Sequence, residues 1–76
     1  MKTFNVKLST IEDVKQFVTA ASMFDGEIDL KSGRYVVDAK SIMGIFSLDL
    51  MSPIEVTVHG EGCDDFLKTV DKYIVE

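Results

Sequence analysis

The sequence has very few of the residues that build disulfide or metal sites. Its 76 residues include one cysteine, Cys63, and one histidine, His59. A single cysteine excludes an internal disulfide framework, and with only one histidine to join it no zinc-type cluster can form. We therefore expect no metal site, and the low cysteine content fits a reducing cytoplasm.

Long apolar runs and an excess of basic charge are also missing. The amino end, MKTFNVKLSTIEDV, carries charges at Lys2, Lys7, Glu12 and Asp13, so it lacks the apolar stretch of a signal peptide, and no later run is suited to span a membrane. The formal net charge of −5 argues against nucleic acid and against an anionic membrane surface. We expect a cytoplasmic protein with protein or small-molecule partners.

What remains is enough for one small module. Apolar residues make up 46% of the chain, which supports a hydrophobic core in a single domain over residues 1–76. The sequence contains no set of nucleophile, base and oxyanion group, and no glycine-rich phosphate loop. We expect a protein that is not an enzyme and that uses no cofactor, with no catalytic residues to assign.

Alternation of apolar and polar residues predicts four strands. The first covers residues 4–8, and residues 28–31 and 35–37 form a hairpin around the turn residues Ser32 and Gly33. Residues 54–59 form the last strand, after Pro53.

Spacing of three and four predicts three helices. The first covers about residues 10–24, and either Ser9 with Glu12 or Thr10 with Asp13 has the spacing of a capping box at its start. A short helix of about residues 41–49 follows Ser41, whose side chain can cap it. A final helix begins at Cys63 or Asp64 and carries its apolar face as far as Ile74.

The order of elements is βαββαβα. It predicts an α+β fold, an open-faced sandwich in which three helices cover one face of a four-stranded, mostly antiparallel sheet.

The segment Lys40-Ser41-Ile42-Met43-Gly44, continued by Phe46-Ser47-Leu48, resembles the regulatory-serine segment of HPr. HPr is the small phosphocarrier of the bacterial phosphoenolpyruvate-dependent sugar phosphotransferase system. Length and element order also match across nearly the whole chain, and the five-residue string is the specific part of the resemblance.

The other hallmark of the family is absent. HPr proteins carry a phosphorylatable histidine in a Gly-Leu-His-x-Arg-Pro pattern, and counting back from Gln16 places Thr10 at the histidine position. Glu12 and Asp13 stand at the arginine and proline positions, so carboxylates replace the guanidinium that would pair with the phosphoryl group. In lacking the histidine while keeping the serine, the sequence is similar to the catabolite-repression HPr-like proteins.

The resemblance implies a regulatory role in carbon catabolite repression. In the family, the serine that matches Ser41 is phosphorylated by HPr kinase/phosphorylase, and the phosphoserine form binds a catabolite-control transcription regulator. Ile42, Met43 and Phe46 would belong to the surface that docks these partners or the phosphotransferase-system enzymes.

Several alternatives remain open. Ser41 can be a helix cap and nothing more, since serine is a common cap. The protein can be a phosphocarrier that uses another residue, or an unmodified protein-binding module. We interpret His59 as an exposed strand residue, Arg34 as a hairpin residue and Cys63 as structural.

Overall fold

The computed structural model describes residues 2–75 and contains five strands and three α-helices in that range. In chain order the elements are β1 (Lys2–Val6), α1 (Ile11–Met23), β2 (Glu27–Ser32), β3 (Tyr35–Asp38), α2 (Ile42–Phe46), β4 (Ile54–His59), α3 (Asp64–Val70), the 3₁₀ helix η1 (Asp71–Tyr73) and β5 (Ile74–Val75).

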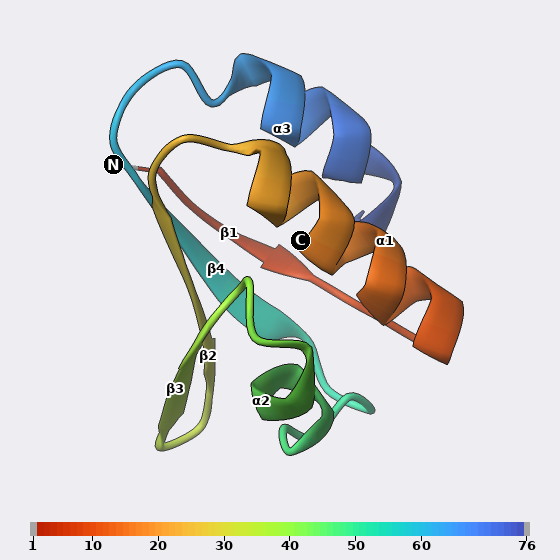
Figure 1. Cartoon of the computed structure of the whole chain (residues 1–76). Coiled ribbons are helices and arrows are strands. Elements are labelled where there is room, and N and C mark those ends of the chain that lie inside the picture. Colours follow the sequence, from red (N-terminus) through yellow and green to blue (C-terminus); the bar gives the residue numbers. More distant parts are fainter. Residues whose placement is uncertain (1, 76) are drawn as a thin grey trace.

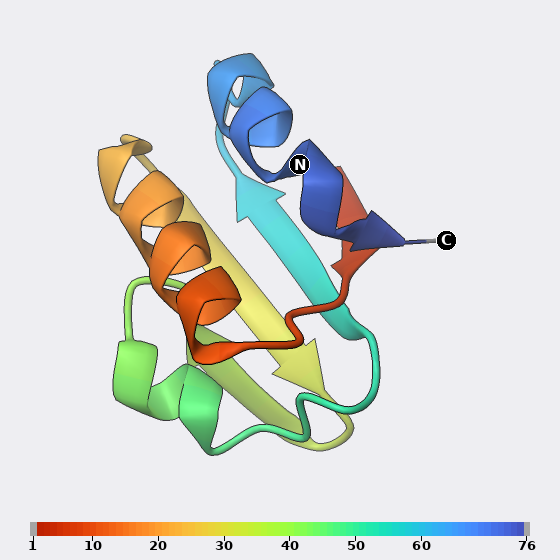
Figure 2. The same ribbon diagram turned by 90° about the vertical axis from the view of Figure 1, so that its right-hand side faces the viewer.

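The strands form one sheet in the order β3-β2-β4-β1-β5, and every neighbouring pair is antiparallel. The helices lie on one side of this sheet, with α1 beside α3 and the short α2 close to β3 (Figures 1 and 2). Alternation places Val56 and Val58 of β4 under the helices, whereas Glu55 and Thr57 face the open side. The predicted α+β sandwich is therefore confirmed.

The predicted number of strands was wrong. The sheet has five strands because the last predicted helix stops early: α3 ends at Val70, and η1 turns the chain back towards β1. There the carbonyl of Tyr73 accepts a hydrogen bond of 2.9 Å from the N–H of Lys7, and Ile74 pairs with Val6. Two residues of β5 thus cover part of the outer edge of β1.

The core lies between the sheet and the helices. Phe17 of α1 is fully buried and meets Phe66 of α3 edge to face, with ring centroids 5.6 Å apart. Phe24 also packs against Phe66, with ring centroids 6.0 Å apart. These aromatic contacts hold α1 and α3 together over the central strands.

Helix α1 begins where a capping box was expected. Of the two pairs with the right spacing, the structure uses Thr10 with Asp13, each side chain accepting a hydrogen bond from the backbone of the other. Helix α2 is shorter than predicted, because the carbonyl of Gly44 already accepts from the N–H and the hydroxyl of Ser47. No helix within residues 2–75 has the length and apolar character needed to cross a membrane.

Candidate functional site

Ser41 is the N-cap of α2 and lies exposed at the surface. Its Oγ accepts a hydrogen bond of 3.3 Å from the N–H of Gly44, and its own N–H donates to the carbonyl of Asp38 at 2.9 Å. The Oγ contact is longer than most N–H···O hydrogen bonds, so the cap is weak. The hydroxyl is therefore accessible from solvent and only loosely held.

Gly44 explains one position of the string that carries the family resemblance. A Cβ atom at this residue would lie 3.1 Å from Ser41 Oγ and 3.3 Å from Val37 Cβ. These separations are shorter than an ordinary van der Waals contact, so a side chain here would require Ser41 Oγ or Val37 to give way by a few tenths of an ångström. The sequence showed the glycine, but only the tertiary structure shows how closely Val37 of β3 approaches it.

The three predicted docking residues differ in exposure. Met43 is 77% exposed and Phe46 is 38% exposed, whereas Ile42 is partly buried and packs against the core. Ile11, in the first turn of α1, is 63% exposed. The outer side of α2 thus exposes Met43 to solvent, while Ile42 packs the helix against the core.

Thr10, which the sequence resemblance places at the histidine position of the family, caps α1. Its Oγ1 accepts from the N–H of Asp13 at 3.1 Å, and Asp13 Oδ2 accepts from the N–H groups of Thr10 at 3.3 Å and Ser9 at 3.1 Å. Glu12 adds a second carboxylate in the same turn. The N-terminal end of α1 therefore already carries the Asp13 carboxylate, which is bonded to the two N–H groups just before the helix, where a phosphoryl group would otherwise gain stabilisation.

His59 lies half-exposed on the open face of the sheet and is paired. Its Nε2 is 3.0 Å from Oδ2 of Asp29 on the neighbouring strand β2, and each side chain is 42% exposed. The sequence indicated the exposed face but missed the partner, because Asp29 is brought close only by the register of β2 with β4.

Two other predicted residues have structural positions. Arg34 is exposed in the hairpin turn between β2 and β3, next to Gly33, whose positive φ of 59° favours glycine. Cys63 is the N-cap of α3 and is buried with 6% exposure. Neither residue lies in α2 or in the first turn of α1.

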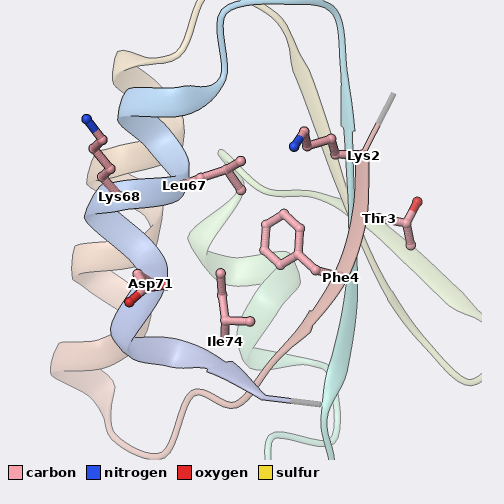
Figure 3. Close-up of a pocket in the computed structure, with 7 residues that line it drawn as sticks. All are labelled: Lys2, Thr3, Phe4, Leu67, Lys68, Asp71 and Ile74. Atoms are coloured by element: carbon pink, nitrogen blue, oxygen red, sulfur yellow. The ribbon is translucent and has the colours of Figure 1, made fainter.

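A groove opens between β1 and α3 (Figure 3). Its lining residues are Lys2, Thr3, Phe4, Leu67, Lys68, Asp71 and Ile74. The side chains of Phe4, Leu67 and Ile74 form its apolar floor, and none of the predicted site residues contributes to it. Within residues 2–75, no three metal-ligating side chains are grouped so that they could hold an ion.

Comparisons with known proteins agree with the fold. The sequence model for the family described as "PTS HPr component phosphorylation site" matches residues 13–75. The matched range begins after Thr10.

Two solved structures are similar. The crystal structure of HPr-C-His from Thermoanaerobacter tengcongensis matches with a TM-score of 0.78 and 24% identity, over 95% of this chain and 89% of that chain, which supports the fold alone. The crystal structure of a phosphocarrier protein HPr from Bacillus anthracis str. Ames matches with a TM-score of 0.74 and 27% identity, over 97% of this chain and 96% of that chain. Because the family model covers most of the sequence, the chain belongs to the HPr family of the phosphotransferase system.

Proposed function

We propose that this protein is a regulatory, cytosolic member of the HPr family that acts through protein contacts and is phosphorylated on Ser41, and that it is not a histidine phosphocarrier. The observation that carries the proposal is the N-cap of α1. Thr10 occupies the position that the resemblance gives to the phosphohistidine, and its hydroxyl is engaged with the backbone of Asp13.

The chemistry of this turn opposes phosphoryl transfer from phosphoenolpyruvate. A threonine hydroxyl is a weak nucleophile without a neighbouring base, and it cannot form the phosphoimidazole on which the family's transfer depends. The carboxylates of Glu12 and Asp13 lie in the first helical turn and repel an incoming phosphoryl donor.

His59 is a poor substitute for the missing histidine. A phosphoryl group on Nε2 would displace its contact with Asp29 Oδ2 and would lie beside that carboxylate. The length of β4 also separates His59 from Thr10. His59 ends β4, whereas Thr10 follows the end of β1 that pairs with the beginning of β4.

Ser41 is the better acceptor. Its hydroxyl is exposed, and the capping bond that phosphorylation would replace is long. A phosphate adds about −1.5 to −2 charges and three acceptor oxygens, which the first-turn N–H groups of α2 can meet. The new charge would stand next to the exposed Met43, so phosphorylation would change the surface that partners contact.

The test is intact-mass spectrometry after two parallel incubations. One contains HPr kinase/phosphorylase with ATP, and the other contains enzyme I with phosphoenolpyruvate. We expect one phosphate from the kinase alone, lost in Ser41→Ala and kept in Ser47→Ala, the matched serine at the other end of α2. Phosphate acquired from phosphoenolpyruvate would overturn the proposal.

The docking surface is tested separately by surface substitutions. Met43→Asp should weaken binding of the phosphorylated protein to the catabolite-control transcription regulator, because it puts a charge on an apolar contact. Met23→Asp is the matched control, since Met23 is 83% exposed and lies at the far end of α1. Equal binding by both variants would exclude α2 as the docking surface.

A further inference from the structure

Strand β3 lies at one end of the sheet. Among residues 2–75, no strand pairs with β3 on the side away from β2. Tyr35 is 70% exposed and Val36 is 60% exposed, so the edge carries apolar side chains. Natural edge strands are usually protected by short length, charge, proline or a bulge, because exposed edges invite pairing, and β3 is short.

The hydrogen-bonding pattern of the hairpin shows which backbone groups point outward. The register pairs Leu30 with Val37, and the N–H of Ala39 donates to the carbonyl of Ile28 at 2.9 Å. Antiparallel bonding alternates along a strand, so the N–H and C=O of Val36 point away from β2. The carbonyl of Asp38 also points outward, since it accepts from the N–H of Ser41 at 2.9 Å.

The residues around Val36 are self-complementary in charge. The edge reads Arg34-Tyr35-Val36-Val37-Asp38, with opposite charges two residues to either side of Val36. If two copies pair antiparallel with Val36 opposite Val36, each Arg34 comes opposite Asp38 of the other copy. The same register satisfies the free N–H and C=O of both Val36 residues.

Asp38 has a further reason to attract a cation. It stands directly opposite Asp29 in the ladder, and like charges in cross-strand positions destabilise a sheet. Asp29 is already paired with His59, whereas the contact of Asp38 is with the backbone N–H of Lys40 at 2.8 Å. A guanidinium from a second copy would offset this repulsion.

From these features we infer that the edge of β3 is a homodimerisation surface, on which a second copy of the chain adds its own β3 antiparallel in the register centred on Val36. The two sheets then become one continuous sheet. Because β3 has only four residues, the interface is small and the dimer is weak, with its population rising steeply at high protein concentration.

The test uses sedimentation velocity of the full chain from micromolar to millimolar concentration, with paired charge reversals. In a dimer of the Arg34→Glu variant, the introduced carboxylate of each copy would lie opposite Asp38 of the other copy. In a dimer of the Asp38→Arg variant, the introduced guanidinium of each copy would lie opposite Arg34 of the other copy. Each variant alone should therefore dimerise at least about tenfold more weakly than the unmodified chain.

An equimolar mixture of the two variants can form a dimer that contains one copy of each. In the register centred on Val36, this mixed dimer has no pair of like charges. In the mixed dimer the Arg34→Glu copy has carboxylates at positions 34 and 38. The Asp38→Arg copy has guanidinium groups at the same two positions. Both cross-strand contacts are attractive, so the mixture should dimerise at least as well as the unmodified chain.

Controls separate this register from general charge effects. Lys15→Glu makes the same change in net charge as Arg34→Glu on the exposed side of α1, and it should leave dimerisation unchanged. Circular dichroism of each variant checks the fold. A monomeric unmodified chain at millimolar concentration would overturn the inference, and so would a mixture that associates no better than either variant alone.

Discussion

Thr10 and Asp13 cap each other: Thr10 Oγ1 accepts from the N–H of Asp13 at 3.1 Å, and Asp13 Oδ2 accepts from the N–H of Thr10 at 3.3 Å. The pair satisfies backbone donors at the start of α1 that no carbonyl can reach. A capping box thus occupies the turn in which, by resemblance, other HPr proteins carry their phosphohistidine.

Thr10→Ala should lower the free energy of unfolding by about 1 kcal/mol, because it removes the hydroxyl that accepts from Asp13. In a domain of this size that corresponds to a fall in Tm of about 4–8 °C. Urea unfolding measures the loss. Thr10→Ser keeps the acceptor and should stay close to the unmodified protein; equal losses in the two variants would mean that the cap is not the cause.

Restoring the family's residues should restore some acceptor activity. Thr10→His with Glu12→Arg supplies an imidazole and a guanidinium in the first turn of α1, and enzyme I with phosphoenolpyruvate should then add an acid-labile phosphate. Thr10→His alone should react at least about tenfold more slowly, since the carboxylate at Glu12 repels the phosphoryl group that an arginine would bind. Phosphate incorporation over time measures both rates, with Glu12→Arg as the control that should show none.

Truncating the core residue Phe17 should cause a large loss of stability. This side chain is fully buried and contacts the ring of Phe66, so Phe17→Ala should cost about 3–5 kcal/mol in unfolding free energy. A small domain has about 5–15 kcal/mol in total, so this variant would be close to unfolding. Lys15→Ala, on the exposed side of the same helix, should change stability by less than about 0.5 kcal/mol, and a similar cost in both would contradict the assigned core.

The sequence was sufficient for the fold class because alternation in the strands and three-to-four spacing in the helices agree with the burial that the structure shows. It was not sufficient for the end of the chain. Val70, Tyr73 and Ile74 fit a continuing helix by spacing, and β5 is too short to display an alternation of its own. Only the contact of Tyr73 with Lys7 shows that the chain has turned back to the sheet.

The candidate site was predictable only in part. Ser41 and Thr10 are local caps, and their spacing to Gly44 and Asp13 can be read along the chain. The pairing of His59 with Asp29 depends on strand register, which no local pattern contains. The exposed fraction of Met43 and the burial of Ile42 likewise depend on how α2 is seated against β3.

Because α2 packs closely against β3, Gly44→Ala should not give the usual gain in the free energy of unfolding. Replacing glycine by alanine within a helix normally stabilises it by about 1 kcal/mol. At Gly44 the added Cβ would lie 3.3 Å from Val37 Cβ and 3.1 Å from Ser41 Oγ, so the helix must shift and the gain should disappear. The neighbouring exposed position, Met43, provides the reference. Met43→Ala should have a higher free energy of unfolding than Met43→Gly by about 1 kcal/mol. Urea unfolding of the three variants decides the matter: a full stabilisation in Gly44→Ala would show that α2 has room to move away from β3, and that the glycine of the string is not required by packing.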